Sequence, residues 1–196
     1  MKFIIGITGK IGSGKTIIAN HISKKCNNAP IYRFSKILLD ILRRLYLEST
    51  RENFQKLGSS LREEFGKDVI VNAMMRDLEK EKGKVVIIDG IRYLNEIEML
   101  EKLKLSKGNN VNTLLIGVDA SPRLRYERCI NRKNEKKKES SLTFEEFLIL
   151  SEKKETEKEI DLVLKKVDYL IDNNSKTTKE ELMKKIDEIL EKEGII

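Results

Sequence analysis

Tryptophan is absent from this chain of 196 residues, and aromatic residues of all kinds make up only 6% of it. Proteins that hold single-stranded nucleic acid stack the bases on aromatic side chains set among basic ones, and no stretch of this sequence alternates the two. The formal net charge is +7, but much of the excess lies in segments that mix Lys with Glu, such as Lys133–Glu139 and Lys153–Glu159. Such segments are usually solvated, so a nucleic-acid partner is not expected.

Cysteines and long apolar runs are also scarce. Cys26 and Cys129 are far apart and form no C-x-x-C pair, which argues against a disulfide framework or a Cys-based zinc site. The apolar stretch 3–7 is too short for a signal-peptide core or a membrane span. We therefore expect a cytoplasmic protein with reduced thiols, no membrane contact and one domain, residues 1–196. The sequence is compatible with a monomer or a homodimer.

Short apolar runs alternate with longer amphipathic segments along the chain. The runs occupy residues 3–8, 85–89 and 113–118, with shorter candidates at 31–34 and 169–171. Their apolarity is continuous, which is typical of strands covered on both faces of a parallel sheet. The alternation predicts an α/β fold, a doubly wound five-stranded parallel sheet flanked by helices.

Two segments interrupt this rhythm. Residues 35–82 hold two or three predicted helices with no strand between them, and residues 128–142 are strongly basic and then polar. We predict that both are insertions on a single core.

Residues 9–16 match the pattern G-x-x-x-x-G-K-[ST] of a phosphate-binding loop, or P-loop. The match follows the first predicted strand and opens a helix, which is the context that the pattern requires. Glycines let the loop wrap closely around phosphates, and the N-terminus of the helix adds its positive dipole end. The residues predicted to bind the donor nucleotide here are Gly9, Gly12, Ser13, Gly14, Lys15 and Thr16. Lys15 would bridge the β- and γ-phosphates of ATP, and the Thr16 hydroxyl would bind Mg²⁺.

A carboxylate follows the second long apolar run. Residues 85–88 deliver Asp89 to the carboxyl end of a strand, which is the edge where open α/β sheets bind ligands. There Asp89 can hold Mg²⁺ or accept a proton, and the sequence does not decide between these roles. Gly90 allows close backbone approach, and the forked guanidinium of Arg92 can bind a phosphate.

The P-loop, the segment Asp89-Gly90-Ile91-Arg92 and the last predicted strand together resemble the nucleoside monophosphate kinase superfamily, over nearly the whole chain. Three nearer likenesses occur within it. Residues 50–59 and 89–96 resemble phage-type deoxynucleoside monophosphate kinases. Residues 119–122 with Arg125 and Arg128 resemble archaeal adenylate-kinase-related proteins. Residues 10–15 and 167–173 resemble dephospho-coenzyme A kinase, although Phe34-Ser35 stand where that kinase has an Asp pair.

This resemblance implies a P-loop nucleotide kinase fold in which 35–82 is the monophosphate-binding region and 128–142 a short lid over ATP. The implied substrate-binding residues are Arg51, Gln55, Arg62 and Arg92. The implied catalytic residues are Lys15, Asp89, Arg128 and Arg132, and Asn173 is implied to lie near the adenine.

The implied activity is transfer of the γ-phosphoryl group of Mg²⁺-ATP to a small phosphorylated acceptor, a nucleoside or deoxynucleoside monophosphate. Two alternatives stay open. One is dephospho-coenzyme A kinase, and the other is a nucleotide-binding switch or regulatory ATPase that phosphorylates no small molecule.

Overall fold

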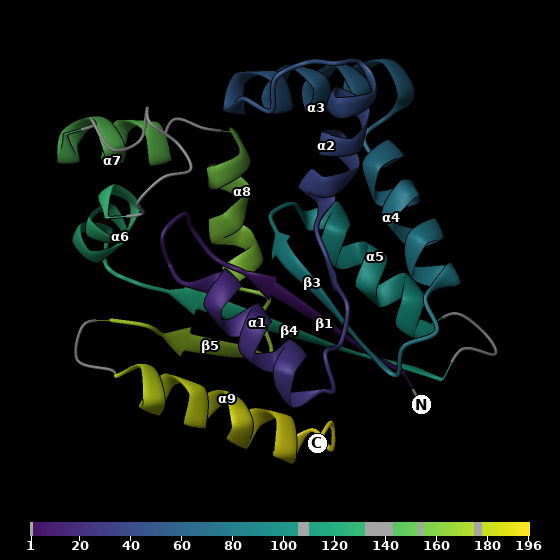
Figure 1. Cartoon of the computed structure of the whole chain (residues 1–196), viewed down its shortest axis with the longest axis vertical. Coiled ribbons are helices and arrows are strands. Elements are labelled where there is room, and N and C mark those ends of the chain that lie inside the picture. Colours follow the sequence, from purple (N-terminus) through teal and green to yellow (C-terminus); the bar gives the residue numbers. More distant parts are fainter. Residues whose placement is uncertain (1, 106–109, 132–142, 153–154, 175–177) are drawn as a thin grey trace.

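The computed structural model contains one sheet of five parallel strands in the order β2-β3-β1-β4-β5, with helices on both faces (Figure 1). The strands are β1 (Lys2–Thr8), β2 (Ile31–Tyr32), β3 (Val85–Ile91), β4 (Val111–Asp119) and β5 (Tyr169–Asp172). The helices are α1 (Lys15–Lys25), α2 (Phe34–Arg44), α3 (Arg51–Phe65), α4 (Val69–Lys80), α5 (Leu94–Leu105), α6 (Pro122–Ile130), α7 (Phe144–Glu152), α8 (Glu155–Leu164) and α9 (Lys179–Lys192). The structure describes residues 2–105, 110–131, 143–152, 155–174 and 178–196. The predicted fold class is confirmed.

Successive residues of the central strands point to opposite faces of the sheet, so each strand contributes to two cores. In β1, Ile4 packs with α2, α4 and α5 on one face, whereas Ile5 and Ile7 pack with α1 and α9 on the other. All three side chains are at most 1% exposed. Burial of each contributes about 2 kcal/mol to folding, which fixes the strand ends that carry the site.

The segment between β2 and β3 folds into three helices, α2, α3 and α4, as the sequence predicts. The strand predicted at 31–34 is only two residues long, and this boundary was wrong. Phe34 already belongs to α2, because Phe34, Leu38 and Leu42 recur at helical spacing and are all buried. Within the described ranges, no helix has the length and apolarity that crossing a bilayer requires.

Candidate functional site

The P-loop runs from the end of β1 into α1 and packs tightly against β4, α6 and the segment after β5. Its glycines Gly9, Gly12 and Gly14 have φ angles of +144°, +78° and +106°, which L side chains rarely adopt. A Cβ atom on Gly12 would lie 2.5 Å from the carbonyl oxygen of Arg125 in α6, and one on Gly14 would lie 2.3 Å from the Nδ2 atom of Asn173 after β5. The backbone therefore comes closer to its neighbours here than any side chain would permit.

Asn173 and Arg128 hydrogen-bond to the backbone of this loop at Ser13. The Nδ2 atom of Asn173 donates to the Ser13 carbonyl at 2.7 Å. Arg128 donates through Nη2 to the carbonyl of Asn173 at 2.9 Å and through Nη1 to the Ser13 carbonyl at 3.4 Å. Burial lowers the pKa of the Arg128 guanidinium. Both residues therefore support the loop in this structure. The sequence did not predict this contact, since Asn173 was expected near the adenine and Arg128 at the transferred phosphate.

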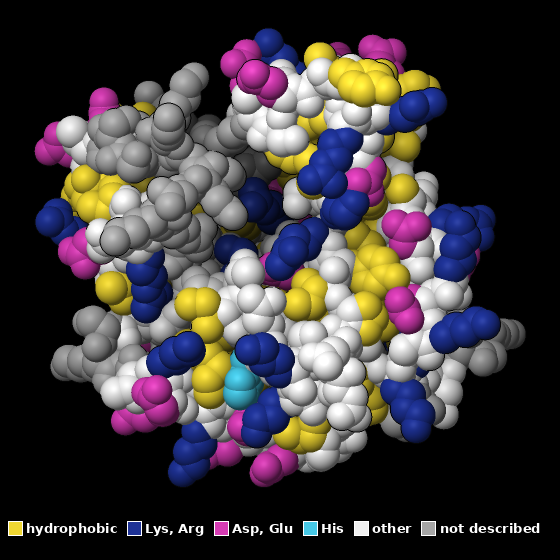
Figure 2. Space-filling model, in the orientation of Figure 1, with side chains coloured by type: hydrophobic (Ala, Val, Ile, Leu, Met, Phe, Trp, Pro, Cys, Tyr) yellow, Lys and Arg dark blue, Asp and Glu magenta, His cyan; other side chains and the backbone are white. Residues whose placement is uncertain are grey.

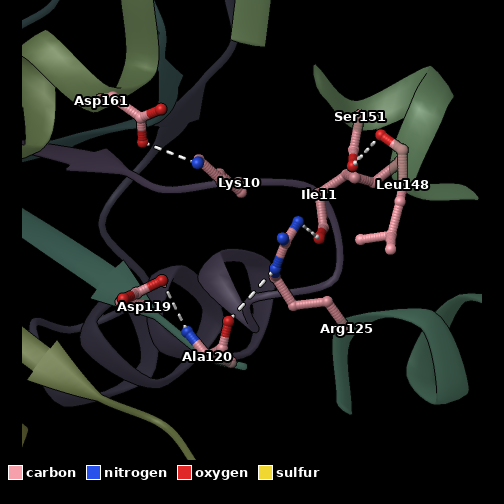
Figure 3. Close-up of polar contacts among 8 residues, drawn as sticks. All are labelled: Lys10, Ile11, Asp119, Ala120, Arg125, Leu148, Ser151 and Asp161. Carbon is pink, nitrogen blue, oxygen red and sulfur yellow. Dashed lines mark hydrogen bonds and ion pairs between the residues drawn. The ribbon is translucent and has the colours of Figure 1, made fainter. Parts of the chain in front are cut away.

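Two further contacts fix the outer part of the loop (Figure 3). Arg125 is only 4% exposed and donates to the carbonyls of Ala120 at 3.1 Å and Ile11 at 3.4 Å. Lys10 forms an ion pair of 2.7 Å with Asp161 in α8. Helices that follow β4 therefore clamp the loop from the side, an arrangement with no local signal in the sequence.

The cradle inside the loop fits a phosphate group. Ser13 is fully buried, and its Oγ atom has no hydrogen-bond partner among the described residues. A buried hydroxyl without a partner costs about 1–3 kcal/mol, and a phosphate oxygen would satisfy it. The Lys15 ammonium lies over the same loop and donates to the carbonyls of Gly9 at 2.6 Å and Lys10 at 2.9 Å. The first turn of α1 adds backbone N–H donors that have no carbonyl acceptor within the helix.

Asp89 lies beside this cradle, at the carboxyl edge of the sheet as predicted. It is 7% exposed, and its Oδ2 atom accepts from the Thr16 hydroxyl at 3.2 Å and from Arg33 Nε at 2.9 Å. The pairing of β3 with β1 shifts register just after Asp89, at Gly90, whose φ is +100°. Sequence reasoning missed Arg33, because its partner lies 56 residues away and no motif marks it.

Thr16 and Asp89 are an oxygen-donor set suited to Mg²⁺. Among the described residues, no group of three or more His, Cys, Asp or Glu side chains is placed to hold a metal ion. Mg²⁺ is commonly held by one or two protein oxygens together with water and substrate phosphates. The pair therefore fits a metal that would arrive with its nucleotide.

One of the predicted acceptor-binding residues, Arg92, follows β3 at the same edge of the sheet. Arg62 of α3 stacks on the Tyr93 ring, with its CZ atom 4.5 Å from the ring centroid. Tyr93 directly follows Arg92, which is half-buried after β3. Gln55 lies exposed on α3.

The remaining predicted residues lie outside the described part of the chain. These are the side chain of Arg51, the whole of Arg132, and residues 132–142 of the predicted lid. Their roles stay predictions.

Glu96 organises the turn that carries Arg92. It is 2% exposed, and its Oε2 atom accepts from the backbone amides of Arg92 at 2.7 Å and Tyr93 at 3.3 Å. Burial raises the pKa of Glu96 to about 7. The next amide, of Leu94, donates to the carboxylate of Glu159 in α8 at 3.2 Å. The resemblance pointed to this segment, but not to a buried acid that holds it.

The elevated pKa of Glu96 predicts a stability that depends on pH. The folded protein keeps the proton up to about pH 7, whereas the unfolded chain releases it near 4.5. The stability that protonated Glu96 contributes is therefore complete below pH 4.5 and is lost as the pH rises to 7. Relative to Glu96→Gln, we expect the wild type to lose on the order of 3 kcal/mol of unfolding free energy across this range.

Urea unfolding of both proteins at pH 5 and pH 8 measures this difference. Glu98→Gln, at an exposed position of the same helix, is the matched control and should follow the wild type. A Glu96→Gln profile parallel to the wild type would contradict the prediction.

With this geometry established, comparison with known proteins identifies the family. Residues 5–158 match the family described as an AAA domain. A UPF0200 protein from Sulfurisphaera tokodaii is 31% identical over 191 residues, which cover 96% of this chain and 96% of that protein. The chain belongs to both the AAA-domain family and the UPF0200 family. A second UPF0200 protein, from Hyperthermus butylicus, is 32% identical over 131 residues, 67% of this chain and 66% of that protein.

The fold of this UPF0200 protein is similar to that of a shikimate kinase from Bacteroides thetaiotaomicron. The TM-score is 0.60, and the match covers 96% of this chain and 97% of that chain at 14% sequence identity. At this identity the likeness shows the fold alone. The predicted P-loop kinase fold is therefore confirmed, and the P-loop domain implies that this UPF0200 protein binds a nucleotide.

Proposed function

We propose that this UPF0200 protein transfers the γ-phosphoryl group of ATP to a nucleoside or deoxynucleoside monophosphate. The observation that carries the proposal is that two groups of residues able to bind anions follow the neighbouring strands β1 and β3 at one edge of the sheet. One is the P-loop cradle with the unsatisfied Ser13 hydroxyl. The other is the turn after β3, where Arg92 lies and Arg62 stacks on Tyr93.

On the donor side, the loop amides and Lys15 would bind the phosphates of ATP. Thr16 and Asp89 would hold Mg²⁺, which when bound neutralises charge on the phosphates. The contacts of Lys15 with two loop carbonyls keep its ammonium at the cradle, where phosphate oxygens can replace those carbonyls. Arg128 keeps the loop in shape, and Arg132 is proposed to reach the transferred group.

On the acceptor side, Arg62 and Arg92 would hold the phosphate of the monophosphate, and Arg51 and Gln55 of α3 are proposed as further acceptor-binding residues. Catalysis would then come from positioning and from electrostatic stabilisation. A phosphate monoester is largely ionised at pH 7, so its attacking oxygen needs no general base. This suits a site whose Asp89 carboxylate is already engaged by Thr16 and Arg33.

A panel of acceptors tests the proposal. We expect ADP release from Mg²⁺-ATP to rise at least about tenfold with one or more nucleoside or deoxynucleoside monophosphates, because an acceptor phosphate reacts faster than water from a positioned complex. Chelation of Mg²⁺ by EDTA should abolish the increase. The measurement is a coupled assay of ADP release, with product identified by chromatography.

The same panel separates the alternatives. If dephospho-coenzyme A alone accepts the phosphoryl group, the protein is a dephospho-coenzyme A kinase and the proposal is wrong. Equal hydrolysis in every well, including those without acceptor, would favour a regulatory ATPase.

A further inference from the structure

The Arg33 guanidinium is anchored through one of its nitrogens, and the rest of the group is accessible to solvent. It is the N-cap residue of α2 and directly follows β2. Its Nε atom donates at 2.9 Å to the same Asp89 oxygen that accepts from the Thr16 hydroxyl. The Arg33 side chain is 41% exposed, against 5% for Asp89. The ion pair therefore holds a partly exposed guanidinium beside Thr16 and Asp89, the proposed Mg²⁺ ligands.

The outer part of this guanidinium keeps donors for a ligand. Arginine has five N–H donors in a planar fork, and the contact with Asp89 is made through Nε. Among the residues that the structure describes, Asp89 is the only side chain paired with Arg33. The two Nη groups can therefore present the paired geometry that binds a phosphate or carboxylate.

The position of Arg33 places this fork beside the proposed acceptor site. Strand β2 is the neighbour of β3 in the sheet, so Arg33 and Arg92 follow adjacent strand ends. Arg62 reaches the same turn by stacking on Tyr93. Figure 2 shows Lys and Arg side chains gathered around the hollow at the centre of this face, between α3 and α1.

The charges at this edge favour a dianion. Arg33, Arg62 and Arg92 lie at this edge, whereas the charged carboxylates described at it are Asp89 and Glu159, since burial favours the neutral form of Glu96. The surplus of positive charge suits a phosphate group better than a neutral hydroxyl or a single carboxylate.

We infer that Arg33 binds the phosphate of the acceptor while anchored on Asp89, and so sets the distance between that phosphate and the donor site. The inference rests on the proposed function and deepens it by assigning the side chain that recognises the acceptor's phosphate. Because Nε is held in advance, the fork is oriented before the acceptor arrives, which makes binding of the acceptor depend strongly on this one side chain.

Two variants of Arg33 test the assignment by their kinetics. Arg33→Lys keeps a positive charge near Asp89 but removes the fork, and Arg33→Gln removes both. We expect the KM for the monophosphate to rise about 10-fold in Arg33→Lys and about 100-fold in Arg33→Gln, with the KM for Mg²⁺-ATP within about threefold of wild type. Arg76→Gln, which removes an exposed arginine paired with Glu79 in α4, is the control and should change neither constant. An unchanged acceptor KM, or an equal rise for both substrates, would overturn the assignment.

A binding measurement keeps this test separate from the proposed function. The P-loop is filled with Mg²⁺ and a non-hydrolysable ATP analogue, and inorganic phosphate is then titrated while the melting temperature is recorded. We expect phosphate to stabilise the wild type and Arg76→Gln, and to lose most of this effect in Arg33→Gln. If the wild type phosphorylates no monophosphate but this pattern holds, the proposed function fails and the Arg33 site stands. If phosphate stabilises Arg33→Gln as much as wild type, or stabilises neither, the Arg33 site fails whatever the turnover.

Discussion

Lys15→Ala is expected to lower the turnover number for phosphoryl transfer by on the order of 10²- to 10³-fold or more while the protein stays folded. The ammonium lies at the cradle, held by the carbonyls of Gly9 and Lys10, and in the proposed reaction it stabilises charge on the transferred group. Loss of one such preorganised donor typically has an effect of this size. The measurement is kcat with a saturating acceptor, together with a thermal melt.

The neighbouring Lys10 provides the control for Lys15. Lys10 is also a loop lysine, but its ammonium pairs with Asp161 in α8 and not with the loop carbonyls. Lys10→Ala should therefore change kcat by less than about tenfold, since a partly exposed ion pair contributes little. Wild-type turnover in folded Lys15→Ala would remove Lys15 from the mechanism, and equal losses in both variants would point to the overall charge of the loop instead.

Gly12→Ala is expected to have the largest effect on stability, a loss of about 2–5 kcal/mol. One part of this loss is backbone strain, since Gly12 has a φ of +78° and a left-handed conformation costs other residues about 1–2 kcal/mol. The other part is the clash of the new Cβ with the Arg125 carbonyl 2.5 Å away, where overpacking costs about 1–3 kcal/mol. Because α6 must shift, the contacts of Arg125 and Arg128 with the loop should weaken, and stabilisation by Mg²⁺-ATP should disappear.

The variant Gly194→Ala serves as a control that introduces backbone strain without a steric clash. Gly194 has a φ of +65°, but nothing lies within 4 Å of a Cβ added there. This control should lose only about 1–2 kcal/mol and keep the full response to Mg²⁺-ATP. Urea unfolding and nucleotide-dependent melting measure both effects. Similar losses in the two variants, with nucleotide binding retained in Gly12→Ala, would contradict the packing argument.

The parts of the site that the sequence could predict are those encoded in short local patterns. The P-loop is one unbroken stretch of residues in a strand–helix context, and Asp89 is placed by the apolar run before it. The β2 boundary was missed because a short stretch such as residues 31–34, apolar except for Arg33, fits either a strand or a helix start. Only the packing of Phe34 against the core decides that it begins α2.

The residues that the sequence could not assign owe their roles to contacts between distant segments. Arg33 pairs with Asp89 across 56 residues, and Arg125 contacts Ile11 across 114 residues. Glu96 was visible only as part of a motif, since its isolation from water depends on how α5 packs on the sheet. Arg125 and Glu96 look like surface residues until the fold buries them.

The brace from Asn173 to the Ser13 carbonyl has a consequence for biosynthesis. The two residues are 160 positions apart, so the ribosome makes the loop well before it makes the residue that supports it. A nascent chain that stops before β5 emerges from the exit tunnel holds every residue of the P-loop pattern, yet lacks the amide that fixes Ser13. A nucleotide can therefore meet a supported loop only after β5 and Asn173 have been translated.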